Sequence, residues 1–127
     1  MAQSAWPIFI DACKSRHLIV VDVPADVAED PAELIALLID LVNPNGNFAL
    51  RAEKTAIGTR LFCAFAEPTD VDMMVQATDA QEDNVYSGWA SEYHCQLDRT
   101  AAEAIRGAAT VLKPRRSVPG SARPTGV

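Results

Sequence analysis

The chain has 127 residues, of which 49% are apolar, 22% charged and 6% aromatic. This balance is typical of an ordinary globular domain and excludes the disordered and fibrous classes. A chain of this length buries roughly two thirds of its unfolded surface, so it needs no disulfide or metal for stability. We expect one α+β domain over residues 1–112 and a flexible basic tail, rich in proline and glycine, over 113–127.

Charge is unevenly distributed along the chain. The net charge is −6, yet the predicted tail contains four basic residues and no acidic one. Residues 1–112 therefore hold 17 acidic against 7 basic residues. A domain this acidic repels phosphate backbones, so we expect no nucleic-acid partner. Only the basic tail offers a surface for an acidic partner.

Nothing in the sequence predicts a membrane or secreted location. The longest apolar run, 34–42, has about half of the roughly 20 residues that a bilayer crossing needs, and it contains Asp40. The N-terminal segment lacks a basic start followed by an unbroken apolar stretch, so we expect no secretory signal. Cys13, Cys63 and Cys95 are odd in number and are not spaced as redox or zinc pairs. We expect a cytoplasmic protein with reduced thiols and no membrane partner.

Hydrophobic periodicity and capping residues predict the secondary structure. Residues 17–24 form a short apolar run, rich in β-branched residues and closed by Pro24, which is typical of a central strand. Asp30, followed by Pro31 and Glu33, predicts the start of a helix that continues to residue 42. The same reasoning gives strands at 47–54, 60–66 and 87–97, helices at 7–16, 70–80 and 100–112, and a loop at 81–84.

The order of these elements predicts a ferredoxin-like fold. After the first helix they follow the pattern βαββαβ, and a last helix completes the domain. The ferredoxin-like sheet is antiparallel and four-stranded, with strand order 4-1-3-2 and two helices on one face. The first and third strands, 17–24 and 60–66, are apolar on both faces, as central strands are, and the other two carry the charges. We expect this α+β sheet with an extra N-terminal and an extra C-terminal helix.

Two segments also resemble a known group of proteins. FAEPTDVDMMVQATDA (65–80) and SGWAS (87–91) are similar to a strand, a short acidic helix and a Gly-aromatic strand. This combination recurs in small uncharacterised bacterial proteins with a ferredoxin-like βαββαβ domain. The stretch 65–91 that contains both segments is about a fifth of the chain. The resemblance implies the fold and no activity.

One face of the predicted sheet is a candidate association surface. Because side chains alternate along a strand, Leu18, Val20, Phe62 and Ala64 lie together on the face opposite the two helices. Such an apolar stripe is too large to stay exposed in a monomer. The N-terminal helix, the C-terminal helix or a second copy of the chain would cover it. We therefore expect a non-catalytic domain that acts through protein association, as a homodimer or with an unidentified regulatory partner.

The alternative function is a small-molecule or effector-binding domain, or a small enzyme, with a pocket between the sheet and a covering helix. His17, Trp89, Tyr93 and Cys95 would line this pocket, because all four fall in the phase that faces the helices. We expect His17 and Cys95 to lie near each other, because the first strand begins where the antiparallel fourth strand ends. A pocket that holds both side chains within hydrogen-bond reach would favour this alternative.

Other chemistry has weaker support in the sequence. A metal site would need His17 and His94 to meet, but their phases put them on opposite faces of the sheet. Cys63 lies in an apolar strand, where a thiol stays protonated and inert. The loose likeness of 60–66 to the RNA-recognition strand motif lacks its Gly-aromatic start, and strand 17–24 lacks a stacking aromatic residue. We expect no cofactor, no metal and no catalytic residue.

Overall fold

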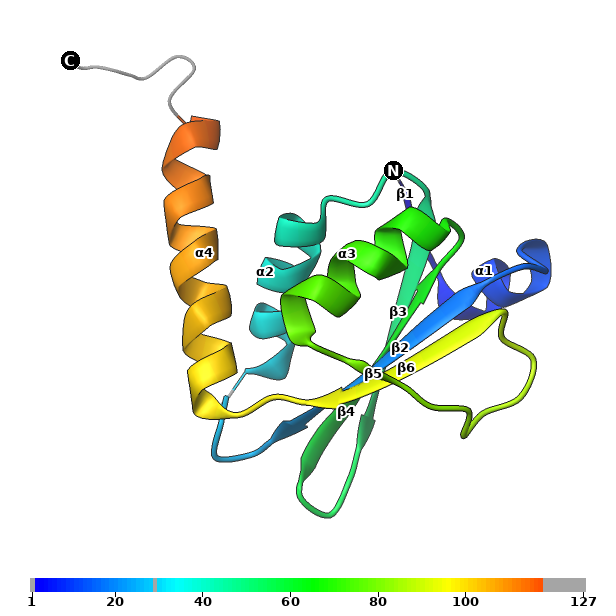
Figure 1. The fold of residues 1–127 in the computed structure, drawn as a ribbon, viewed down its shortest axis with the longest axis horizontal. Helices are drawn as coiled ribbons and strands as arrows, with labels where there is room; N and C mark the ends of the chain where they lie inside the picture. Colours follow the sequence, from blue (N-terminus) through cyan, green and yellow to red (C-terminus); the bar gives the residue numbers. More distant parts are fainter. Residues whose placement is uncertain (1, 29, 118–127) are drawn as a thin grey trace.

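A computed structural model describes residues 2–28 and 30–117 of the chain. Figure 1 shows the path of the chain through one twisted sheet and its helices. In chain order the elements are β1 (Ala2–Ser4), α1 (Trp6–Ala12), β2 (His17–Pro24), α2 (Pro31–Val42), β3 (Asn47–Lys54), β4 (Gly58–Phe65), α3 (Pro68–Thr78), β5 (Gln81–Glu82), β6 (Ser91–Gln96) and α4 (Arg99–Ser117).

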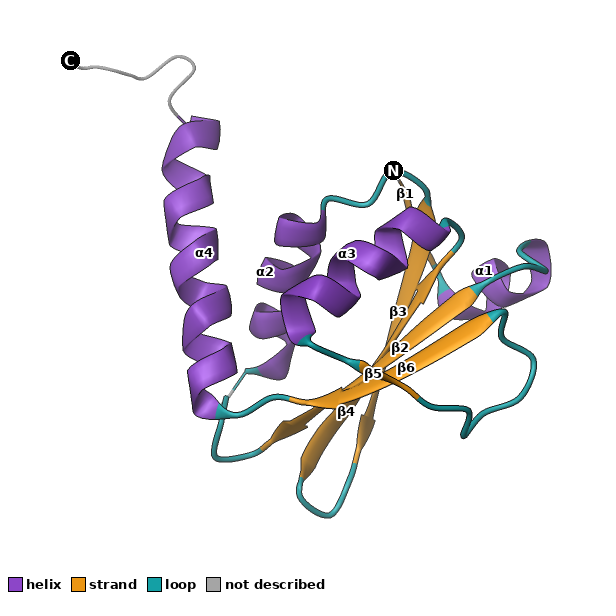
Figure 2. Ribbon diagram, in the orientation of Figure 1, coloured by secondary structure: helices purple, strands orange, loops and turns teal. Residues whose placement is uncertain are grey.

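The described strands form one six-stranded mixed sheet in the order β1-β3-β4-β2-β6-β5 (Figure 2). The central strand β2 pairs antiparallel with β4, where Val20 lies opposite Phe62, and parallel with β6, where Val20 lies opposite His94. β3 pairs antiparallel with β4, and β5 pairs antiparallel with β6. The short β1 pairs parallel with β3. The predicted adjacency of the two apolar strands, β2 and β4, is confirmed.

The predicted ferredoxin-like sheet is wrong. That sheet is antiparallel and four-stranded, whereas the described sheet is mixed, has six strands and contains the parallel pair β2–β6. The difference arises after α3. Gln81 and Glu82 form β5 at the margin of the sheet, and the loop 83–90 then turns the chain back, so that β6 lies beside β2. The predicted elements have a loop at 81–84 in place of β5, so the predicted last strand runs in the opposite direction.

α2, α3 and α4 cover one face of the sheet and bury the main core. Ile19, Val21 and Val23 of β2 enter this core, where they join Leu38 of α2 and Met74 of α3. These five side chains are at most 1% exposed. Burial of each side chain of this size stabilises the fold by roughly 1.5–3 kcal/mol. The burial of these side chains therefore contributes a large part of the stability of the domain.

The helices α2 and α3 begin and end at residues suited to those positions. Asp30 accepts a hydrogen bond from the amide of Glu33 at 3.2 Å, which confirms the predicted N-terminus of α2. Asn43 and Asp79 adopt the left-handed conformation at the C-termini of α2 and α3. Asn and Asp tolerate this conformation better than most residues, so they end the helices at little cost.

α4 lies beside α2 at one side of the molecule (Figure 1). Its buried residues Ala102 and Ile105 join the main core. The helix continues to Ser117, beyond the predicted end at residue 112, and the rest of the predicted tail lies outside the described residues. Among the helices of the described ranges, none combines the length and the apolar character that a membrane crossing needs.

The buried carboxylate of Asp70 fixes the turn between α2 and β3. Its side chain is 2% exposed, and its two oxygens accept hydrogen bonds from the amides of Asn45 and Gly46, each at 2.9 Å. Hydrogen bonds to an ionised group are stronger than bonds between neutral groups. Asp70 therefore determines where β3 begins.

α1 and the loop 83–90 cover the other face of the sheet. Leu18, Val20, Phe62 and Ala64, the predicted association stripe, are at most 3% exposed. The side chains packed on this stripe and its neighbours are Trp6, Phe9 and Ile10 of α1 and Tyr86 and Trp89 of the loop. The N-terminal helix thus supplies part of the cover, which is one of the predicted alternatives, and the loop supplies the rest. α1 and the loop therefore cover the predicted stripe within the chain itself.

Candidate functional site

β3 has an open outer edge over residues 50–54. β1 pairs with β3 only at residues 47–49, so beyond Ala49 the strand has no neighbour on that side within the described part of the chain. Residues 51–54 are exposed, and Leu50 is half-buried. An edge of this kind presents free backbone N–H and C=O groups to any strand that approaches it.

The hydrogen bonds of the β3–β4 pair show which backbone groups point outward. The amide of Thr55 donates to the carbonyl oxygen of Gly58 at 2.9 Å. Hydrogen-bonded and non-hydrogen-bonded residue pairs alternate along an antiparallel pair. At the other end of the pair, the amide of Ala66 donates to the carbonyl oxygen of Asn47 at 3.0 Å, which agrees with this alternation. The odd-numbered residues of β3 therefore bond to β4. The residues whose backbone groups face the open edge are Leu50, Ala52 and Lys54.

An apolar groove of about 470 Å³ lies beside this edge, between β3 and α2. Leu50 and Ala52 line it from β3, and Ala32, Ala36 and Ile39 line it from α2. Both alanines of α2 are exposed. Because their side chains are small, they leave room for apolar groups to enter between the helix and the strand.

The edge also carries charges of both signs, on the face of β3 opposite the side chains of Leu50 and Ala52. Arg51 and Glu53 project from the same side of β3, because they are two residues apart. Their charged groups lie 3.8 Å apart, and each side chain is 44% exposed. The guanidinium of Arg51 also lies 4.3 Å from the ring centroid of Phe62 and 5.6 Å from that of Trp6. These cation–π contacts hold the Arg51 side chain beside the edge.

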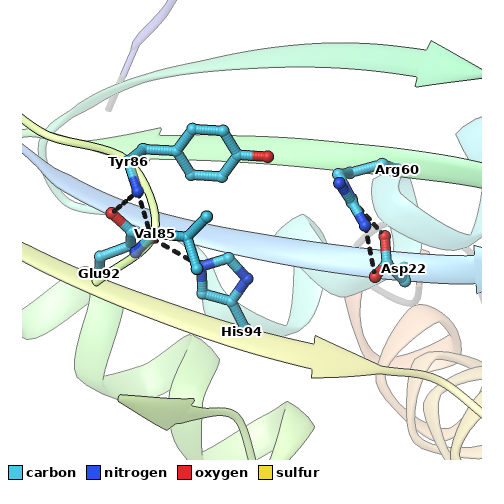
Figure 3. A network of polar contacts seen from close by, with 6 residues as sticks. All are labelled: Asp22, Arg60, Val85, Tyr86, Glu92 and His94. Carbon is cyan, nitrogen blue, oxygen red and sulfur yellow. Dashed lines mark hydrogen bonds and ion pairs between the residues drawn. The ribbon is translucent and has the colours of Figure 1, made fainter. Parts of the chain in front are cut away.

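A second polar cluster lies where the loop 83–90 meets β6 (Figure 3). The carboxylate of Glu92 is 1% exposed and accepts hydrogen bonds from the amides of Val85 at 2.8 Å and Tyr86 at 3.0 Å. Nε2 of His94 lies 2.7 Å from the same carboxylate, and the His94 ring stacks on Tyr86 with centroids 6.0 Å apart. Burial opposes ionisation of Glu92, but these hydrogen bonds outweigh it and lower its pKa. The ionised carboxylate therefore holds the loop on the sheet.

Arg60 and Asp22 form an ion pair across β4 and β2 on the same face (Figure 3). Arg60 Nε lies 2.7 Å from one carboxylate oxygen of Asp22, and a second guanidinium nitrogen lies 3.3 Å from the other. The hydrogen bond to Asp22 outweighs partial burial and raises the pKa of Arg60. Because both side chains are partly exposed, the pair contributes little to stability. Its geometry links the two central strands.

The structure does not bring together the residues predicted to line a pocket. His17 lies opposite Ser91, to which it hydrogen-bonds at 2.7 Å, whereas Cys95 lies opposite Val21. His17 and Val21 are separated by about 13 Å along β2. The predicted proximity of His17 and Cys95 is therefore wrong, because β6 runs parallel to β2 and puts the two side chains at opposite ends of the pair.

Two other residues of the predicted pocket lie on different faces of the sheet. Tyr93 faces the helices, as predicted, and packs on the main core with Cys95. Trp89 precedes β6 and packs on the other face, with its ring 6.0 Å from Trp6 and beneath the guanidinium of Arg16. The chain is irregular at Trp89, so the alternation of a strand does not apply there.

Cys63 and Cys95 are poor nucleophiles. Burial raises the pKa of Cys95 to about 11, and burial also raises the pKa of Cys63, whose side chain is 0% exposed. A thiol must ionise to act as a nucleophile or a metal ligand. Over the described ranges, no three His, Cys, Asp or Glu side chains are grouped closely enough to hold a metal ion.

No family model, curated protein or solved structure matches the chain. The resemblance of 65–80 and 87–91 to small bacterial proteins therefore stays a prediction. The open edge of β3 and the buried Glu92 are the features that sequence reasoning missed. The charges in 47–54 do indicate a strand near the margin of a sheet, but no pattern in the sequence distinguishes a buried glutamate from an exposed one.

Proposed function

We propose that this chain is a protein-association domain and that the open edge of β3, with the groove beside α2, is its binding surface. The observation that carries this proposal is the set of outward-facing backbone groups at Leu50, Ala52 and Lys54, next to an apolar groove. A strand added to such an edge gains main-chain hydrogen bonds, while its alternate side chains enter the neighbouring groove. The backbone supplies affinity and the groove supplies specificity.

The remaining surfaces of the sheet support this assignment. The predicted association stripe lies under α1 and the loop 83–90, so it is not available to a partner. The opposite margin of the described sheet is β5, which has only the two residues Gln81 and Glu82. The edge of β3 is therefore the better place for another polypeptide strand.

A proline at Ala52 tests the surface directly. The N–H of Ala52 points outward, so Ala52→Pro removes a donor and puts a ring in the path of an added strand without removing a hydrogen bond of the β3–β4 pair. Random peptides displayed on phage are selected on the wild-type chain, and the affinity of the enriched peptides is then measured on both proteins. We expect binding to the variant to be weaker by about ten-fold or more.

The matched control is Glu82→Pro on β5, at the other margin of the sheet. The amide of Asp83 donates to the carbonyl oxygen of Glu92, so by the same alternation the N–H of Glu82 also points outward. This variant should keep the binding of the selected peptides. Failure to enrich any peptide, or equal binding to wild type and A52P, would contradict the proposal.

A second candidate function rests on the size of the same groove. Its volume lies within the range of roughly 300–1,000 Å³ that small-molecule sites occupy, and it lies between the sheet and a covering helix. We propose as the alternative that an apolar small molecule binds there. A ligand that binds only the folded state raises the melting temperature. A shift that persists in A52P but disappears in Ala36→Trp, which fills the groove, would favour this alternative over strand addition.

A further inference from the structure

We infer that the strand added to β3 is β3 of a second copy of this chain, paired antiparallel around Ala52. This inference rests on the proposed function, because it names the partner of the same surface. It follows from three properties of the edge: the phase of its backbone groups, the length that β1 leaves free, and the order of its charges.

Backbone phase and length restrict how β3 can pair with itself. In an antiparallel pair, a residue whose backbone groups point toward the partner strand lies opposite a residue of the same kind. The two-fold axis of a β3–β3 pair therefore passes through the position of one residue and its copy, and not midway between two consecutive residues of β3. β1 already occupies residues 47–49 on this side. The registers that stay within 50–54 and pair at least three residues are centred on Arg51, Ala52 or Glu53.

Charge selects one register from these three. An axis at Arg51 puts two guanidinium groups directly opposite each other, and an axis at Glu53 does the same with two carboxylates; like charges in this position are destabilising. An axis at Ala52 puts Arg51 opposite Glu53 of the second copy, and does so twice. Both residues bond to β4, so across the new interface they form non-hydrogen-bonded pairs, in which side chains approach most closely.

The same register uses every outward-facing backbone group. Leu50 exchanges hydrogen bonds with Lys54 of the second copy, and Ala52 exchanges them with Ala52 of the second copy. Leu50 and Ala52 lie on the groove side of the strand, so their copies approach α2 from across the axis. The exposed alanines Ala32 and Ala36 leave room for them, and the apolar groove becomes covered.

A charge exchange tests this register. The Arg51→Glu chain carries acids at both facing positions, and the Glu53→Arg chain carries bases at both. Each variant therefore places like charges opposite each other in its own dimer, whereas a mixture of the two places opposite charges in both pairs. Sedimentation velocity measures the dimerisation constant of wild type, each variant, the mixture and the double variant R51E/E53R.

We expect the wild type to dimerise and each single variant to dimerise about ten-fold more weakly or worse. The mixture and the double variant should return toward the wild-type value. A52P should be monomeric, and the matched control Glu82→Arg, on the opposite margin, should dimerise as the wild type does. A mixture that associates no better than the single variants overturns the register.

The wild type provides a test that does not depend on the folding of any variant. Raising the salt from about 50 mM to about 500 mM screens exposed ion pairs, so the dimer should weaken; a dimer unaffected by salt overturns the inference. A wild-type chain that stays monomeric also overturns it. If such a monomer still binds selected peptides that A52P does not bind, the proposed function holds with another polypeptide as partner. If it binds none, both proposals fail.

Discussion

His94 and Glu92 contact each other through a single 2.7 Å hydrogen bond on β6, although only the His94 side chain reaches solvent. The imidazole stacks on the ring of Tyr86, and two loop amides bind the oxygens of the buried carboxylate. A buried charge is stable only when its hydrogen bonds are complete. The ionised Glu92 side chain, together with the backbone hydrogen bonds of Asp83 and Ala90, therefore holds the loop 83–90 and the cover over Leu18 and Val20 in position.

Replacement of Glu92 by Gln should destabilise the domain. Glu92→Gln keeps the shape of the side chain but removes the charge and turns an N–H donor toward the loop amides or His94. We expect the free energy of unfolding to fall by roughly 1–3 kcal/mol, measured by urea denaturation. Glu82→Gln, an exposed change on β5, should alter it by less than about 0.5 kcal/mol. Equal effects of the two changes would show that Glu92 does not anchor the loop.

The contribution of Glu92 should depend on pH. Its pKa is lower in the folded state than the ordinary value of 4.5, so its stabilisation is complete above that value and is lost as the pH falls through the folded value. The difference in unfolding free energy between wild type and Glu92→Gln should therefore shrink below about pH 4.5. Urea titrations of both proteins between about pH 7 and pH 3 measure it. A difference that stays constant to pH 3 would refute the assignment.

The three thiols should differ in reactivity. Cys63 is fully buried and Cys95 has a pKa of about 11, so at about pH 8 neither forms much thiolate. Cys13 is half-buried, at the end of α1. We expect iodoacetamide to modify Cys13 first in the folded protein and all three thiols in urea, as read by mass spectrometry. Modification of Cys95 as fast as Cys13 would contradict this.

Two glycine substitutions should change stability in opposite directions. A Cβ at Gly58 would collide with the backbone carbonyl of Val23 and lie 2.7 Å from the amide nitrogen of Ala25, so Gly58→Ala should cost about 1–3 kcal/mol. A Cβ at Gly107 in α4 meets nothing within 4 Å, and Gly107→Ala should stabilise the domain by about 0.5–1 kcal/mol. Thermal unfolding followed by circular dichroism compares them. A neutral Gly58→Ala would show that the β4 turn can relax.

The part of the fold that could be predicted is the part with long, strongly patterned elements. The apolar runs of β2 and β4 and the capped start of α2 at Asp30 gave their positions and the adjacency of the two central strands. β1 and β5 have three and two residues, too few for any period to appear. β5 runs in the direction opposite to β6, so a prediction that lacks β5 gives β6 the wrong direction.

The candidate site was less predictable than the fold, for a related reason. Alternation in 47–54 shows which side chains share a face, but not whether a neighbour covers the outer edge of the strand. The outer edge of β3 is open beyond Ala49 because β1 ends at Ser4, opposite Ala49. Leu18, Val20 and Phe62 share one face of the sheet, as the alternation of their strands predicts. Their cover comes partly from Tyr86 and Trp89, which lie in the loop that Glu92 binds. No pattern in the sequence of this loop predicts where it packs.

The unequal margins of the sheet also limit how far association can proceed. In the proposed dimer, the outermost described strand at each end of the doubled sheet would be β5, with two residues and the acidic side chain of Glu82. An edge strand this short and this charged offers a third chain few backbone groups to pair with. In the proposed dimer we therefore expect growth to stop at a closed pair, without the fibres that a second long, unprotected margin would nucleate.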